Sequence, residues 1–219
     1  MSIASNLNTI KVGLPENVTL VAVSKTKPVS DLMQAYDAGQ RIFGENKIQE
    51  MTEKWEQMPK DIQWHMIGHV QTNKVKFMAP FVSLIHGVDS LKLLQEINKQ
   101  ALKNNRIIDC LLQIHIAEEE TKFGLDENEL KALISSSDFI ELKNIKVLGL
   151  MGMATFTEDQ NQIKKEFTHL KSIFDSIKEL KTENCNLTTV SMGMSGDYQL
   201  AIECGSTMVR IGSSIFGGR

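Results

Sequence analysis

The sequence has little of what marks a secreted, membrane-bound or nucleic-acid-binding protein. Only 3 cysteines occur among its 219 residues, and their spacing gives no disulfide framework. The formal net charge of −3 provides no positive surface for nucleic acid, and no apolar stretch approaches the length of a membrane span. The first residues lack the basic start and apolar run of a signal peptide. These absences indicate a protein of a reducing cytoplasm.

Linkers, repeats and low-complexity tracts are absent as well. No segment rich in Pro, Gly or Ser divides the chain, and 219 residues with 42 % hydrophobic content suffice for one well-buried core. We therefore expect a single domain over residues 1–219.

What the sequence does contain is a regular alternation of short apolar runs and longer amphipathic segments. The runs are rich in β-branched residues, which is typical of buried parallel strands joined by helical crossovers. They cover residues 20–24, 41–44, 64–68, 83–87, 110–116, 146–151, 188–192 and 208–212. Eight strands alternating with helices predict an α/β fold, a (β/α)8 TIM-type barrel, with an open doubly wound sheet as the alternative.

Several segments between these runs carry helix start signals. Ser30 is a candidate N-cap, and Asp126 with Glu129 and Thr157 with Gln160 have the spacing of a capping box. After Thr157, apolar residues recur at steps of four and three, which predicts a helix with one face packed on the sheet. These apolar residues are Ile163, Phe167, Leu170, Phe174 and Ile177.

Lys25 closes the first apolar run and is the leading candidate for chemistry. It is in line with Val21 and Val23. Because strand side chains alternate with period two, we expect its amine at the rim of a core. The alternative is a lysine that only extends into solvent at a strand end.

Two loops containing glycine and serine follow the seventh and eighth predicted strands. In (β/α)8 barrels these loops commonly hold a phosphate. Glycine lets the backbone approach the anion, and the hydroxyls of Ser195 and Ser213 can donate to it or cap a helix. We predict a phosphate site there, against the alternative of two ordinary strand-to-helix turns.

Arg210 stands inside the last apolar run. A guanidinium buried there needs an acceptor, because an unpaired buried charge is very costly. That acceptor is either a ring nitrogen of a ligand or a carboxylate such as Glu203 or Asp197.

The histidines favour structural roles. His65 and His69 are four residues apart, as metal ligands on a helix can be, but no carboxylate or cysteine joins them. A satisfied polar group or a loop histidine is therefore favoured over a zinc ligand, and His86 is also assigned to the structure.

Five motifs, taken in order along the chain, resemble those of the pyridoxal phosphate homeostasis proteins. They are Val21 to Pro28, Phe43 to Asn46 with Gln49 and Glu50, Trp64 to Gly68 with Gln71, Asn73 and Lys74, Ser191 to Ser195, and Gly205 to Gly212. Their joint occurrence in this order makes the resemblance specific.

The resemblance implies a single (β/α)8 barrel similar to the N-terminal domain of alanine racemase. It implies pyridoxal 5′-phosphate (PLP) as the cofactor, bound as an internal aldimine on Lys25. It also implies that Arg210 meets the pyridine nitrogen. Asn46 matches a motif residue near the cofactor.

For the phosphate of PLP, the resemblance implies three residues. Ser195, Gly212 and Ser213 match the family's phosphate-binding positions. The chain departs from the family at Ser213, where threonine is frequent, and either hydroxyl serves the same purpose.

We expect a PLP-binding protein of PLP homeostasis that buffers or delivers the cofactor without catalysis. A cationic donor such as Arg210 keeps the ring nitrogen unprotonated and weakens the ring as an electron sink. Tyr36 and Tyr198 are the only tyrosines, so a two-base racemase is hard to build. The alternatives are a small PLP-dependent amino-acid racemase or lyase, and a lysine-dependent aldolase that acts on a sugar phosphate.

The resemblance also bears on partners. PLP is the expected ligand, with amino acids as competitors for its aldehyde and apo forms of PLP-dependent enzymes as acceptors. We expect a cytoplasmic monomer with no metal, nucleic-acid or membrane partner.

Overall fold

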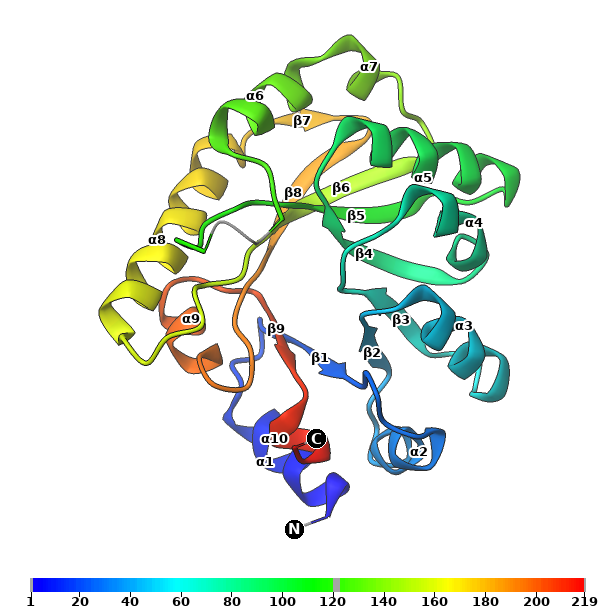
Figure 1. Ribbon diagram of the computed structural model, residues 1–219, viewed down its shortest axis with the longest axis vertical. Helices are drawn as coiled ribbons and strands as arrows, with labels where there is room; N and C mark the ends of the chain where they lie inside the picture. The colour runs from blue at the N-terminus through cyan, green and yellow to red at the C-terminus, as the bar shows by residue number, and fades with distance from the viewer. Residues whose placement is uncertain (1, 120–122, 219) are drawn as a thin grey trace.

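The computed structural model describes residues 2–119 and 123–218. Helices and strands alternate along this length, as Figure 1 shows. In chain order they are α1 (Ile3–Gly13), β1 (Thr19–Val23), α2 (Val29–Asp37), β2 (Ile42–Glu45), α3 (Ile48–Gln57), β3 (Gln63–Met66), η1 (Thr72–Lys74), α4 (Val75–Met78), β4 (Val82–Val88), α5 (Leu91–Lys103), β5 (Ile108–Gln113), α6 (Glu127–Ser135), α7 (Ser137–Ile140), β6 (Ile145–Met151), α8 (Gln160–Ile177), β7 (Lys181–Thr182), β8 (Cys185–Ser191), α9 (Tyr198–Glu203), β9 (Met208–Ile211) and α10 (Ser213–Phe216).

The strands close into a barrel that the helices surround (Figure 1). Among the described residues the sheet has 9 strands in the order β6-β5-β4-β3-β2-β1-β9-β8-β7, and β6 also pairs with β8. In that pairing Gly149 lies opposite Thr189 and Leu150 opposite Val190, which completes the ring. The predicted (β/α)8 barrel is confirmed. The open doubly wound alternative is wrong, because an open sheet keeps two edge strands.

Each predicted strand corresponds to one barrel strand, β1 to β6 followed by β8 and β9. The pattern did not predict β7, a strand of 2 residues that pairs antiparallel with β8. The barrel strands pair in parallel, so their carboxyl ends lie at one rim. Residues directly after β1, β2, β8 and β9 therefore share that rim.

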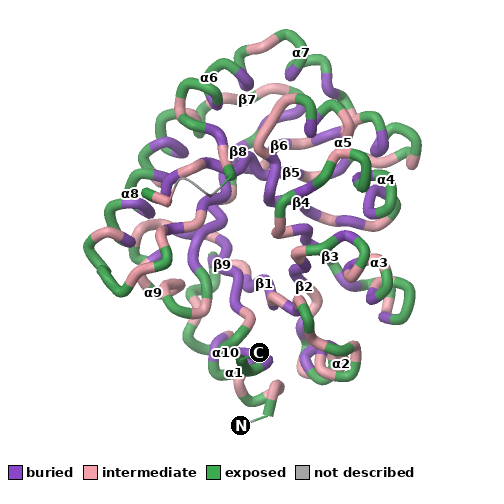
Figure 2. Tube along the Cα trace, in the orientation of Figure 1, coloured by how far each residue is buried: buried purple, intermediate pink, exposed green. Residues whose placement is uncertain are grey.

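Side chains of the barrel strands alternate between a narrow interior and the layer of helices. Val21 belongs to a small interior cluster with Leu111 and Met151, whereas its neighbour Ala22 belongs to the larger core between strands and helices. Figure 2 shows the strands largely buried, while the helices alternate between buried and exposed residues. The alternation decides which strand residues can face a ligand inside the barrel.

The helix predicted after Thr157 is α8, and its apolar stripe is confirmed. Four residues of the stripe are buried: Ile163, Phe167, Leu170 and Phe174. The stripe ends with the last residue of the helix, Ile177, which is partly buried and packs against the same core. Removal of this continuous apolar face from water supplies most of the helix's stability.

Helix starts followed the sequence signals only in part. Asp126 and Glu129 form the predicted capping box of α6. At α8 the N-cap is Asp159, whose side chain accepts from two backbone N–H groups of the first turn, and Thr157 only accepts from the N–H of Asp159. Ser30 does not cap α2, because that helix already begins one residue earlier after a proline. When two acceptors lie close together in sequence, only the path of the backbone decides which of them caps the helix.

The cysteines have the roles that their spacing indicates. Cys110 and Cys185 are buried and Cys204 is half-buried, and all three are free thiols. Burial raises the pKa of Cys185 to about 11 and that of Cys110 as well, so neither buried thiol is reactive at neutral pH. Among the described residues, no helix has the length and apolar character needed to cross a membrane.

Gly149 sets the distance between β6 and β8 and provides a test of barrel closure. A Cβ at this position would lie 1.7 Å from the backbone oxygen of Thr189, so Gly149→Ala forces the two strands apart. We expect the free energy of unfolding to fall by about 3 kcal/mol or more, as for severe overpacking. Urea unfolding followed by circular dichroism measures the change. Gly13→Ala is the control, since a Cβ there meets nothing within 4 Å, and equal losses in both variants would contradict this role of Gly149.

Candidate functional site

Lys25 lies just past the carboxyl end of β1, in the turn that leads to α2. It follows Val21 and Val23 at intervals of two residues, and Val21 belongs to the interior cluster. Lys25 is half-buried and lies at the barrel rim, in the turn just past the strand.

A pocket of about 600 Å³ opens beside Lys25. Its walls come from the turn after β1 and from the segment after β2, and they include Asn46. Lys27 and Lys47 also line it, so three amines surround the space. The pocket joins Lys25 to Asn46, whereas Arg210 and the predicted phosphate residues are not part of its lining.

The loops after β8 and β9 meet each other at the same rim. The backbone N–H of Gly212 donates to Ser195 Oγ at 3.2 Å, and the backbone N–H of Arg210 donates to the carbonyl oxygen of Gly193 at 3.0 Å. Ser213 begins α10 with its side chain exposed. The structure thus gathers Ser195, Gly212 and Ser213 into one cluster of hydroxyl and backbone donors.

Gly212 connects this cluster to β1. A Cβ on Gly212 would lie 2.9 Å from the carbonyl oxygen of Val23, so the backbone at Gly212 packs directly against the end of β1. Because β1 lies between β2 and β9 in the barrel, Lys25 has the Asn46 segment on one side and the serine loops on the other.

Arg210 is only 4 % exposed and stands on the interior face of β9. Its NH1 donates to the carbonyl oxygen and the hydroxyl of Ser191 at 2.9 and 2.7 Å, and its NH2 donates to the carbonyl oxygen of Gly152 at 3.1 Å. These three acceptors are neutral oxygens, whereas the sequence left open a ring nitrogen of a ligand or a carboxylate such as Glu203 or Asp197. Burial lowers the pKa of Arg210 to about 10, while the field of Asp197 raises it, and the guanidinium stays charged at neutral pH.

A buried chain of hydrogen bonds leads from Arg210 across the barrel interior. Ser191 Oγ lies 3.1 Å from His86 Nδ1, and His86 Nε2 lies 3.0 Å from His65 Nδ1. An arginine can only donate, so the Ser191 hydroxyl accepts from Arg210. That hydroxyl has a second lone pair as well as its own proton, so the directions of the bonds to His86 and on to His65 depend on the tautomers of the two rings.

Both histidines in this network of hydrogen bonds, His65 and His86, are neutral. Burial lowers the pKa of His65 to about 3, and burial together with the fields of His65 and Arg210 lowers the pKa of His86 well below its ordinary value. The structural roles that the sequence favours for His65 and His86 are confirmed, since each ring is satisfied by a neighbour. Their link to Arg210 through Ser191 was not predicted. The available signal was that all four residues occupy interior positions of their strands.

Arg210 also has donors left for a ligand. Its three hydrogen bonds within the described chain use three of the five N–H groups that a guanidinium carries. A buried cation that donates to three neutral oxygens and keeps further N–H groups fits a ligand with a ring acceptor and a negative charge. The donor set around the rim, an amine beside two serine hydroxyls and backbone N–H groups, fits an anionic aldehyde such as PLP.

Among the described residues, no group of three or more His, Cys, Asp or Glu side chains could hold a metal ion. His69, separate from the buried pair, is exposed and lies 3.5 Å from Asp89. The hydroxyl of Tyr36 donates to Asp61, just before β3 begins and therefore at the opposite end of the barrel, and Tyr198 packs against the core between strands and helices.

Comparisons with known proteins agree with the fold and the motifs. The family model of the alanine racemase N-terminal domain matches residues 1–219. Curated pyridoxal phosphate homeostasis proteins of Aquifex aeolicus and Escherichia coli are 40 % and 37 % identical to this chain, covering 95 % and 94 % of it and 91 % and 87 % of their own lengths.

Solved structures show the same similarity in space. PipY of Synechococcus elongatus, solved without PLP, has a TM-score of 0.92 and 32 % identity, covering 99 % of this chain and 100 % of its own. PipY with PLP bound has a TM-score of 0.89. An alanine racemase of Clostridium difficile has a TM-score of 0.79 at 16 % identity, covering 100 % of this chain and 60 % of its own, which shows a common fold. This chain belongs to the alanine racemase N-terminal domain family and, within it, to the pyridoxal phosphate homeostasis proteins.

Proposed function

We propose that this chain, as a single domain over residues 1–219, binds PLP reversibly and serves PLP homeostasis by buffering or delivering it. The observation that carries the proposal is Lys25 at the barrel rim, just past the end of β1, next to the strand that holds a buried guanidinium with donors to spare. Val21 of β1 lies opposite Arg210 of β9 in this pairing. The relative PipY, of the same fold, has been solved with PLP bound.

Lys25 is the proposed point of attachment. When bound, PLP supplies a reactive aldehyde. Lys25 would hold the group at that aldehyde through its Nζ, with the aldehyde oxygen and two amine protons released as water. Water or another amine would reverse this attachment, as a protein that hands over its ligand requires.

The remaining site residues orient the ligand. Arg210 donates to the ring nitrogen from the barrel interior, where Ser191 holds its guanidinium. Ser195, Gly212 and Ser213 hold the phosphate through hydroxyl and backbone donors. Asn46 flanks Lys25 from the side of β2.

We further propose that the chain does not catalyse amino-acid chemistry. A guanidinium donor at the ring nitrogen leaves that nitrogen unprotonated, which weakens the ring as an electron sink. Neither Tyr36, bonded to Asp61, nor Tyr198, packed against the core, is in a position typical of a racemase base. The curated relatives carry the name of a homeostasis protein.

The proposal extends to partners and location. Free amino acids compete with Lys25 for the aldehyde, and apo forms of PLP-dependent enzymes are the acceptors. The chain works as a monomer in the cytoplasm.

Lys25→Ala tests the attachment. We expect the variant to lose the imine absorbance that PLP produces with the wild type, because the amine of Lys27, two residues on, is already bonded to the carbonyl oxygen of Gly218. Borohydride reduction followed by peptide mass spectrometry locates the adduct. Lys27→Ala is the matched control, since Lys27 Nζ lines the same pocket but donates to the carbonyl oxygen of Gly218. An adduct on Lys27 in the wild type would refute the assignment, and a wild type without any imine signal would favour the aldolase alternative.

A second prediction concerns the phosphate. We expect pyridoxal, which lacks the phosphate, to bind far more weakly than PLP, because hydrogen bonds to a charged group contribute about 1.5–3 kcal/mol each. Titration of Ser195→Ala and Ser213→Ala should give losses of this size for PLP and almost none for pyridoxal. Ser172→Ala, an exposed hydroxyl on α8, is the control. Equal affinities of the wild type for pyridoxal and PLP would contradict the phosphate site.

A third prediction concerns turnover. Loaded wild-type protein should show no racemisation, transamination or decarboxylation of common amino acids at rates near the ~1–10³ s⁻¹ of enzymes. Arg210→Glu should allow ring protonation and exchange of the α-proton in deuterated water, provided that the imine absorbance shows that the ligand remains bound. Rapid wild-type turnover would instead support the racemase or lyase alternative.

A further inference from the structure

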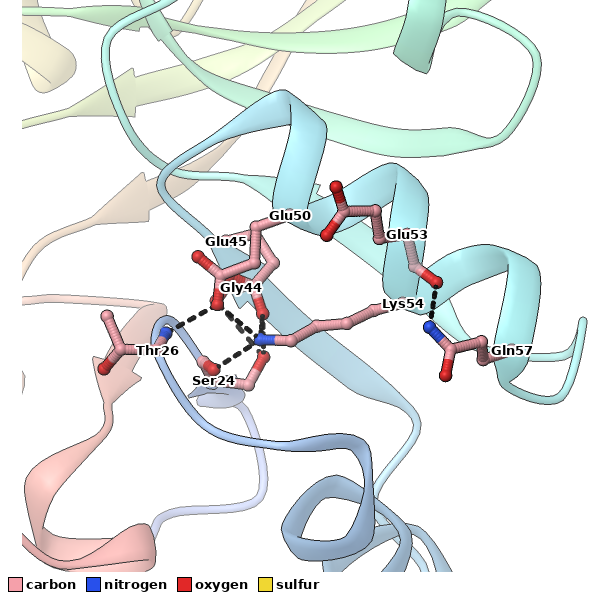
Figure 3. Close-up of polar contacts among 8 residues, drawn as sticks. All are labelled: Ser24, Thr26, Gly44, Glu45, Glu50, Glu53, Lys54 and Gln57. Atoms are coloured by element: carbon pink, nitrogen blue, oxygen red, sulfur yellow. Dashed lines mark hydrogen bonds and ion pairs between the residues drawn. The ribbon is translucent and has the colours of Figure 1, made fainter.

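A buried cluster of charged side chains lies against the turn that carries Lys25 (Figure 3). Its centre is Lys54 of α3, which is 6 % exposed. The Lys54 ammonium donates to the carboxylates of Glu45 and Glu50 at 2.7 Å each and to the carbonyl oxygen of Ser24 at 2.8 Å. These contacts use all three donors of the ammonium group.

The turn itself has an unusual backbone. Thr26, directly after Lys25, has a φ of 64°, in the left-handed region that β-branched residues rarely adopt. Such a conformation persists only where the surroundings enforce it. The backbone N–H of Thr26 donates to Glu50 Oε1 at 2.6 Å, the same oxygen that accepts from Lys54.

The cluster thus fixes the backbone on both sides of Lys25. On one side, Ser24 donates its hydroxyl to Glu45 Oε1 at 2.6 Å and its carbonyl oxygen accepts from Lys54. On the other side, Thr26 is bound to Glu50. Lys25 makes none of these bonds, so its side chain remains available while its backbone is framed.

We propose that Glu50, held in place by Lys54, is a positioning residue that keeps Thr26 left-handed and thereby directs Lys25 to the aldehyde carbon. This inference rests on the proposed attachment of PLP to Lys25. Glu50 lines the pocket beside Lys25, but in this role its carboxylate serves Thr26 and Lys54 and does not bind the ligand. It raises the fraction of the protein in which the amine is placed for bond formation.

The composition of the cluster indicates that it sets the backbone geometry of the turn more than it stabilises the fold. Burial raises the pKa of Glu45 even though Lys54 and Ser24 act to lower it, and Glu45 Oε2 has no hydrogen-bond partner in the described residues. Buried ion pairs of this kind are often no more stable than well-packed apolar side chains. Apolar side chains, however, cannot hold a backbone N–H in a left-handed turn.

A positioning role of Glu50 affects covalent binding to Lys25 but not non-covalent binding of the ring and phosphate. Pyridoxine 5′-phosphate has the ring and the phosphate of PLP but a hydroxymethyl group in place of the aldehyde, so it cannot bond to Lys25. We expect Glu50→Ala to weaken PLP binding and imine formation about tenfold or more. The left-handed conformation of Thr26 is unfavourable, and without Glu50 nothing enforces it. Its affinity for pyridoxine 5′-phosphate should stay within about threefold of the wild type, because the phosphate and ring contacts are untouched.

Glu53→Ala is the matched control. It removes the same charge from the same helix, but the Glu53 carboxylate accepts from Gln49 and not from the turn. In Figure 3 the bond drawn to Glu53 comes from Gln57 and reaches its backbone oxygen. Both constants should match the wild type in this variant. Glu50→Gln serves if Glu50→Ala does not fold. Its amide oxygen can still accept from Thr26 but binds Lys54 more weakly, so we expect a smaller loss with the same selectivity for PLP over pyridoxine 5′-phosphate.

Thr26→Gly provides a rescue that a merely stabilising role of Glu50 would not give. Glycine adopts the left-handed conformation without strain. The loss caused by Glu50→Ala should therefore shrink by at least about threefold in the Thr26→Gly background. An equal loss in both backgrounds would overturn the inference, as would an equal loss of affinity for both ligands.

Failure of the underlying function gives a different result. If borohydride trapping in the wild type finds no adduct on Lys25, the proposed attachment is wrong and the positioning role falls with it. If the wild type carries the adduct on Lys25 but Glu50→Ala forms it with an unchanged constant, only the positioning role is wrong.

Discussion

The pairing of β6 with β8 is the contact on which the rest of the molecule depends. It converts an open parallel sheet into a ring and brings the carboxyl ends of all barrel strands to one rim. Lys25 after β1 and the serine loops after β8 and β9 then lie at the same rim, although nearly the whole chain separates them in sequence. Only glycine fits at position 149 in this pairing, because a Cβ there would lie 1.7 Å from the partner strand's backbone.

Closure also creates a buried interior that contains a charge. Arg210 stays cationic there by donating to Ser191 and Gly152, neutral oxygens that satisfy some donors and leave others. A carboxylate partner would neutralise the site before a ligand arrived. Ser191, His86 and His65, which lie behind Arg210, are all neutral. The guanidinium therefore remains the main source of positive charge in the barrel interior.

The rim is held by two different kinds of contact. Where β8 and β9 end, hydroxyl and backbone groups bind each other, as in the bond from Gly212 to Ser195. Where β1 ends, a buried ammonium and two carboxylates frame the turn around Lys25. The first arrangement leaves short polar groups that can bind an anion, and the second fixes a backbone conformation that Thr26 does not favour by itself. Each suits the part of a phosphorylated aldehyde that it would face.

Local pattern in the sequence determined the strands, the barrel class, the α8 stripe and the place of Lys25 at the end of the first strand, because period and composition report how one segment meets its neighbours. The motifs identified the family. The sequence could not rank Thr157 against Asp159 as a cap, since both are acceptors and only the backbone path selects one. Nor could it find the acceptors of Arg210 or the bond from Glu50 to Thr26, which join residues on different strands and helices. Those contacts depend on distances across the closed barrel and its rim, and only the tertiary structure decided them.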